Sequence, residues 1–216
     1  MSSNNRSRTR QPPLLAAIGA LTLVLAGRAG VAQELTAVTQ NAMDTAVGVC
    51  GTCHGPDGNS TDAKFPRLAG QHPGYLVRQL KFFKERSRGD PDAIAYMWGM
   101  ASGLSPDTID ALAQYYARQE PGHGTRHDPA MVAHGRDIFE HGIPSQGVPA
   151  CAACHGVDAL GSDMYPRLAG QHAEYILKQL ASFQSNMRDI AVMHGVAQNL
   201  RAPEMQAVAE YLESLP

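Results

Sequence analysis

The chain has 216 residues, which is enough for one large domain or two small ones. Hydrophobic residues make up 44% of it and charged residues 18%, a composition that excludes a disordered protein. The formal net charge of -2 gives no reason to expect a nucleic-acid-binding protein.

The first 32 residues have the pattern of a secretory signal. Three arginines within residues 6–10 precede an apolar stretch over residues 14–26, and the small residues Gly30 and Ala32 follow shortly before Gln33. This order is typical of a cleavable signal, so we expect export to a bacterial periplasm. The apolar stretch falls short of the about 20 residues that span a membrane. An uncleaved N-terminal anchor is the alternative interpretation.

The remainder of the chain contains an internal duplication. Residues 65–84 and 165–184 are identical at 11 of 20 positions, and a Cys-x-x-Cys-His motif precedes each of these stretches. A segment rich in proline, glycine and polar residues at 120–129 has the composition of a linker. We therefore expect a signal peptide at 1–32, an N-terminal domain at 33–120 and a C-terminal domain at 121–216.

The predicted secondary structure is helical throughout both repeats. Apolar residues at helical spacing predict a helix from Tyr75 that stops at Gly89-Asp90-Pro91, and its counterpart over residues 175–183. Ser105 and Asp128 are good N-caps for two further helices. No stretch shows a sustained period of two, so the predicted fold class is all-α, with long loops between short helices.

The two Cys-x-x-Cys-His motifs carry the predicted chemistry. They span residues 50–54 and 151–155, and the spacing is the attachment signature of c-type haem. Two thiols on one helical turn can bond to the two vinyl groups of a porphyrin, and the histidine that follows can bind the iron. A zinc site would need a second cysteine pair nearby, and a thioredoxin-like pair would need a strand–helix context. Neither condition is met, so we expect two covalent haems.

A methionine in each repeat is the candidate for the second axial ligand. Met97 lies seven residues before Leu104, and Met193 lies seven residues before Leu200. Because thioether sulfur favours ferrous iron, methionine ligation would raise the reduction potential of each haem.

Three other side chains compete with these methionines. Met100 and Met187 are close in sequence, but neither has a methionine at the equivalent position of the other repeat. His194 is adjacent to Met193, and a tryptophan, Trp98, stands at its position in the first repeat. The duplicated offset therefore favours Met97 and Met193, and we expect His194 to face solvent or to lie near a propionate.

Over residues 42–216 the chain resembles the c4-type dihaem cytochromes c, which are built from two class I cytochrome c domains. Both Cys-x-x-Cys-His motifs, both Pro-Arg-Leu-Ala-Gly-Gln stretches and both methionine-plus-helix segments carry the resemblance. It implies axial pairs His54/Met97 and His155/Met193. It also implies thioether bonds to haem at Cys50, Cys53, Cys151 and Cys154. The backbone carbonyls of Pro66 and Pro166 would contact the ligand histidines. Arg67 and Arg167 would pair with haem propionates.

The resemblance implies an electron carrier rather than an enzyme, with no catalytic residue. Its expected partners are redox proteins: a quinol-oxidising complex or dehydrogenase as donor, and a terminal oxidase or reductase as acceptor. We expect a monomer or weak dimer, with peripheral membrane association allowed and no nucleic acid bound. One alternative is a fixed cytochrome subunit of a periplasmic dehydrogenase. A dihaem peroxidase is disfavoured, because it would need an iron that can lose its distal ligand.

Two further features of the sequence lead to expectations. Gly135 and Phe139 are spaced as in class I cytochromes where the first and last helices cross, but no such pair precedes Cys50. The first helix of the N-terminal domain should therefore be short or packed differently. The second feature is a basic run that we interpret as a docking face for an acidic partner, with a solvated helix face as the alternative. Its members are Arg78, Lys81, Lys84, Arg86 and Arg88.

Overall fold

The computed structural model describes residues 36–216, and the predicted signal peptide at 1–32 lies outside that range. Within the described residues the regular structure is helical apart from one isolated bridge between Ile143 and Val148, which confirms the all-α prediction. Residues Thr39–Pro216 form one compact unit that contains both repeats. No helix in the described part of the chain is long and apolar enough to cross a membrane.

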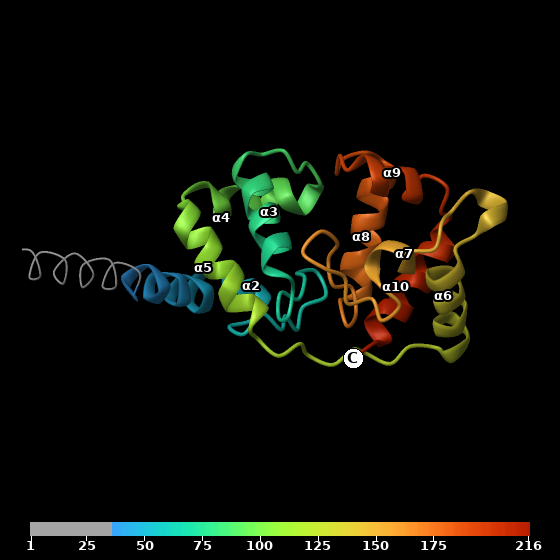
Figure 1. Cartoon of the computed structure of the whole chain (residues 1–216), viewed down its shortest axis with the longest axis horizontal. Coiled ribbons are helices and arrows are strands. Elements are labelled where there is room, and N and C mark those ends of the chain that lie inside the picture. The colour runs from blue at the N-terminus through green and yellow to red at the C-terminus, as the bar shows by residue number, and fades with distance from the viewer. Residues whose placement is uncertain (1–35) are drawn as a thin grey trace, which may run out of the picture. The chain divides into compact units, whose positions relative to one another are not determined.

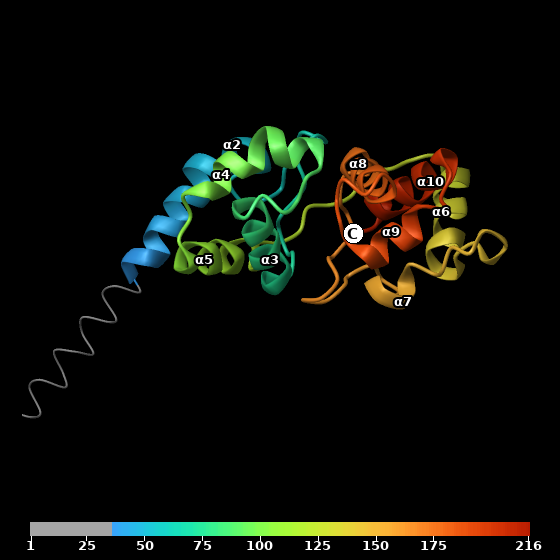
Figure 2. The ribbon, with the colours of Figure 1, turned by 90° about the horizontal axis from the view of Figure 1, so that it is seen from above.

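The first repeat begins with a helical segment, residues 36–45, that continues into the attachment motif. Figures 1 and 2 show its elements from blue to light green. They are η1 (Ala46–Cys50), α2 (Gly51–His54), α3 (Pro73–Lys84), η2 (Ala93–Met97), α4 (Trp98–Ser102) and α5 (Pro106–Ala117).

The second repeat follows the same order, with a short 3-10 turn inserted before its attachment motif. Figure 1 shows its elements from olive to red. They are α6 (Pro129–His141), η3 (Pro144–Gln146), α7 (Ala152–His155), α8 (Ala173–Gln184), α9 (Ala191–Ala197) and α10 (Ala202–Ser214).

The predicted N-caps are confirmed, but the predicted end of α3 is wrong. The Ser105 hydroxyl accepts from the Thr108 N–H at 3.1 Å, and the Asp128 carboxylate accepts from two N–H groups at the start of α6. Helix α3 ends at Lys84, five residues before Gly89. The reason is that Arg86 takes the left-handed backbone conformation, with φ 56°, which a helix cannot continue through.

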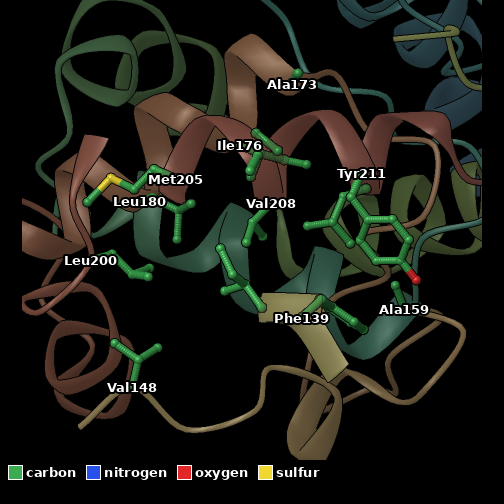
Figure 3. Packing of buried hydrophobic residues seen from close by; sticks show 14 of the residues in the cluster. Phe139, Val148, Ala159, Ala173, Ile176, Leu180, Leu200, Met205, Val208 and Tyr211 are labelled. Carbon is green, nitrogen blue, oxygen red and sulfur yellow. The ribbon is translucent and has the colours of Figure 1, made fainter. Parts of the chain in front are cut away.

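The core of the second repeat depends on a close crossing of α6 and α10. Figure 3 shows Phe139 against Val208 and Tyr211, and Phe139 is 0% exposed with its ring centroid 5.5 Å from that of Tyr211. At the crossing, a Cβ atom added to Gly135 would lie 1.9 Å from the carbonyl oxygen of Ala207. Glycine is therefore required at position 135 by the distance between the two helix backbones.

The first repeat packs its first helix differently, as the missing glycine–aromatic pair led us to expect. Ala42 and Ala46 are buried there against Leu112 and Tyr116. The hydroxyl of Tyr116 donates to the carbonyl oxygen of Ala46 at 3.1 Å. Small alanines thus take the place of glycine, and the aromatic ring comes from the last helix of the repeat.

The two repeats are joined by reciprocal hydrogen bonds from equivalent glutamines. The Gln71 amide accepts from the N–H of Arg167 at 2.8 Å and donates to its carbonyl at 2.9 Å. The Gln171 amide does the same at the peptide groups of Arg67, with the same two distances. Each glutamine therefore satisfies both backbone groups of one residue in the other repeat.

A buried carboxylate, that of Glu213, holds the linker and the first repeat to α10. His172 Nδ1 lies 3.1 Å from Glu213 Oε1, and His127 Nε2 lies 2.8 Å from Oε2. The other ring nitrogen of His172 lies 2.9 Å from the carbonyl oxygen of Ser60. Burial alone would raise the pKa of Glu213, but the hydrogen bonds from His172 and His127 outweigh it and lower the pKa.

We expect Glu213→Gln to destabilise the protein at neutral pH and to have little effect in acid. A carboxylate with a lowered pKa stabilises the fold above its unfolded-state pKa of about 4.3 and loses that contribution as the pH falls through the folded-state value. Denaturant unfolding of the holoprotein between pH 7 and pH 3 measures this. Asp137→Asn, in the exposed Asp137–His141 pair, is the matched control and should change stability little. A pH-independent effect of Glu213→Gln contradicts the prediction.

Candidate functional site

Each cysteine pair lies on one turn of helix immediately before a buried histidine. Cys50 ends η1, and Cys53 with His54 lies in α2. None of the four cysteines, all of which lie in the described residues, is in a disulfide, so all four sulfurs are available for thioether bonds. Residues three apart on a helix share a face, so both thiols of a pair can reach one planar group.

The orientation of both histidines is fixed by a proline carbonyl. His54 Nδ1 lies 2.9 Å from the carbonyl oxygen of Pro66, and His155 Nδ1 lies 3.1 Å from that of Pro166. Because a carbonyl only accepts, Nδ1 carries the proton and Nε2 keeps a free lone pair. Burial lowers the pKa of both imidazoles, which favours this neutral form. The histidines are thus arranged as iron ligands need to be.

An aromatic ring also supports each of these histidines. Phe65 meets the His54 ring edge-on with centroids 6.1 Å apart, and Tyr165 meets the His155 ring in the same way at 6.0 Å. A hollow of about 300 Å³ opens beside the first motif, with Cys53 and Phe65 in its lining. The hollow therefore borders the Cys53 side of the first motif, and neither His54 nor Met97 lines it.

The structure separates the repeated methionines from their rivals. Met97 packs against the buried cluster around Phe83, and Met193 packs against the core of the second repeat. Met100 and Met187 are instead 57% and 53% exposed. The two methionines with the duplicated offset are thus the ones held against the protein interior.

His194 and the two arginines assigned to propionates have protein partners in this structure. His194 is half-buried, and its Nδ1 lies 2.8 Å from the carbonyl oxygen of Phe183. The guanidinium of Arg67 donates to the carbonyl of Gly170 in the other repeat, and that of Arg167 donates to the carbonyl of Pro216 at 2.8 Å. Propionate pairing by these arginines stays a prediction.

The basic run does not form one docking face, so this expectation is corrected. Arg88 is only 5% exposed, and its guanidinium binds Asp90 and two glutamines. Arg78 donates to the carbonyls of Asp163 and Met164 in the second repeat. The spacing of the basic residues gave no sign of the Arg78 contacts, because they form with residues 85 and 86 positions away in the chain.

The cysteines, the oriented histidines and the partly buried methionines suit covalent haem. In residues 36–216, no group of three or more histidine, cysteine or acidic side chains is placed to hold a bare metal ion. The fold and the site together define a two-domain c-type haem protein. The chain belongs to the cytochrome c family, whose model matches residues 41–118 and 132–216, and it carries two covalently bound haem c groups.

Relatives of known type cover most of the chain. Cytochrome c4 from Stutzerimonas stutzeri is 39% identical over 180 residues, covering 78% of this chain and 85% of the relative. A thiosulfate dehydrogenase electron acceptor from Stutzerimonas stutzeri (strain A1501) is 43% identical over 215 residues, covering 93% and 94%. The solved structure of Acidithiobacillus ferrooxidans cytochrome c4 matches with a TM-score of 0.74 at 40% identity, covering 77% of this chain and 98% of that one.

Sequence reasoning missed a buried polar network between α3 and α8. Gln79 and Gln179 each accept hydrogen bonds from both Arg88 and Arg188 at 2.8–2.9 Å. All four side chains are buried. The internal duplication could have indicated this network, since Gln79 and Gln179, and likewise Arg88 and Arg188, lie 100 positions apart. A repeated polar residue far from the attachment motif is a candidate for the contact between the repeats.

Proposed function

We propose that this protein is a periplasmic dihaem electron carrier. It passes single electrons from a quinol-oxidising complex or dehydrogenase to a terminal oxidase or reductase. The observation that carries the proposal is that each domain combines a proline-oriented histidine with a repeated methionine that packs, partly buried, against that domain's core.

The proposed axial pairs are His54/Met97 and His155/Met193. Haem iron supplies a one-electron couple, and a histidine and a methionine that both stay bound leave no position for a substrate. The chain's contribution is to hold both side chains in both oxidation states. The carbonyls of Pro66 and Pro166 restrict rotation of the histidines, so little rearrangement accompanies electron exchange. These points support a carrier rather than an enzyme.

A fixed subunit of a dehydrogenase is the second candidate. It is favoured by the relative named as a thiosulfate dehydrogenase electron acceptor, which matches nearly the whole chain. Affinity purification of the tagged protein from its host separates the two. A stoichiometric dehydrogenase in the purified material would support the subunit, and a free monomer or weak dimer would support the mobile carrier. Recovery from the periplasmic fraction would test the location.

We expect the intact mass of the mature protein to correspond to the polypeptide plus two haems. Replacing Cys50 and Cys53 together by alanine should remove one covalent haem, because that domain then has no thiol to bond. Replacing Cys151 and Cys154 should remove the other. Mass spectrometry of periplasm-expressed protein measures all three. A parent mass with one haem or none overturns the dihaem assignment.

A further inference from the structure

Asp90 is the most buried carboxylate-bearing residue of the first repeat among the described residues, at 2% exposure, and it lies in the connection between α3 and Met97. No feature of the sequence had assigned it a role in the site. A buried carboxylate is costly unless it is hydrogen-bonded and paired. The contacts of both of its oxygens therefore indicate what it does.

One oxygen of Asp90 caps the helical stretch that carries Met97. Asp90 Oδ2 accepts from the N–H of Ala93 at 3.1 Å, and the Asp90 main-chain carbonyl accepts from the N–H of Ile94 at 3.1 Å. Helical backbone then runs without interruption over residues 91–102. Asp90 thus fixes the N-terminal end of the segment on which Met97 is mounted.

The other oxygen ties this segment to the contact between the repeats. Asp90 Oδ1 accepts from Arg88 Nε at 2.5 Å, and the Arg88 guanidinium also donates to Gln179 and Tyr175 of α8. The carbonyl of Arg88 accepts from Trp98 Nε1 at 2.8 Å. Arg88 and Asp90 therefore hold residues 91–98, which we call the methionine segment, at both ends, because Trp98 directly follows Met97.

The second repeat lacks this arrangement. Arg188 is the counterpart of Arg88 and makes the equivalent glutamine contacts. At the position equivalent to Asp90, however, the second repeat has Ile190. Ile190 makes no side-chain cap to α9. Met193 follows Arg188 by five positions, whereas Met97 follows Arg88 by nine. The longer connection, from Arg88 to Met97 in the first repeat, is thus the one that is held by a buried carboxylate.

We propose that Asp90 is a positioning residue for Met97. It keeps the methionine segment of the first domain in place for axial ligation and couples that segment to α8 of the second domain. The second domain holds Met193 on a shorter connection without such a carboxylate. The inference rests on the proposed axial ligation by Met97 and deepens it.

The test is the near-infrared sulfur-to-iron charge-transfer band of the ferric holoprotein, with a redox titration that resolves both haems. In Asp90→Ala, which loses both contacts, we expect the band to fall to about half and the potential of the first haem to drop. Asp90→Asn keeps an acceptor for the Ala93 N–H but loses the charge, so its effect should be smaller. Trp98→Phe, which releases the other end of the segment, should act in the same direction. It provides a second test if Asp90→Ala folds poorly.

Two controls separate positioning from general damage. Asp92→Asn removes a carboxylate from the same segment, one that pairs with Lys178 at 3.3 Å and is about one-third exposed. Asp92→Asn should leave the band and both potentials unchanged. Ile190→Ala, at the equivalent position of the second repeat, should leave the band and the potential of the first haem unchanged. An unchanged first haem in both Asp90→Ala and Trp98→Phe overturns the proposal, and so does an equal loss at both haems. A parent protein without any sulfur-ligated iron overturns the axial ligation itself.

Discussion

We expect Met97→Ala to abolish the sulfur-to-iron charge-transfer band of the first haem and to lower its reduction potential, and we expect Met193→Ala to do the same for the second haem. The physical reason is that water or a stray histidine replaces the thioether, which is the ligand that favours ferrous iron. Near-infrared absorption of the ferric protein and a redox titration measure the two effects. Each variant should alter one haem only, because the two methionines belong to separate domains.

The exposed methionines provide matched controls for this prediction. Met100→Ala and Met187→Ala make the same chemical change within a few residues of each candidate ligand, yet both side chains are more than half exposed. Both variants should retain the band and the potentials of the parent. Loss of the band in Met100→Ala with its retention in Met97→Ala would reverse the assignment in the first domain. The electron-carrier proposal would survive that result.

Gly135→Ala should lower the free energy of unfolding by at least about 3 kcal/mol, at the upper end of what overpacking of a core costs. The added methyl group meets the backbone of Ala207 and the Cβ of Tyr211, which cannot rotate away as a side-chain tip could. Helices α6 and α10 would have to separate, opening the core around Phe139. Denaturant unfolding of the holoprotein measures the loss.

A second glycine shows what the same substitution does without a clash. A Cβ atom on Gly103, which follows α4, would meet nothing within 4 Å, and its φ is -90°. Gly103→Ala should therefore change stability by no more than about 0.5 kcal/mol. If Gly135→Ala is equally mild, the two helix backbones do not approach as closely in solution as the structure has them.

The sequence predicted those parts of the fold that depend on local chemistry. Ser105 and Asp128 mark helix starts because their side chains cap the backbone a few residues ahead, and a short pattern is enough to show this. The end of α3 could not be predicted, because the left-handed residue is Arg86 and not the expected glycine.

In the candidate site, too, the residues close together in the sequence could be predicted, and those that depend on distant contacts could not. The cysteines and histidines lie within five consecutive residues, so their spacing alone indicated their chemistry. The contacts of Arg67 could not be inferred from its neighbours, because the carbonyls that it binds belong to His123 and Gly170, 56 and 103 positions away. The role that we propose for Asp90 could not be predicted either, because it depends on side-chain contacts to Arg88 and Ala93 that Ile190 cannot make in the second repeat.

The reciprocal glutamine contacts affect how freely the two halves can diverge. Across the contact between the repeats, Gln71 and Gln171 bind the peptide groups of Arg167 and Arg67, which every amino acid except proline provides in full. Mutation of either arginine side chain thus leaves this part of the join intact. Any residue except proline at position 67 or 167 should therefore keep these bonds, while loss of either glutamine side chain would remove two of them.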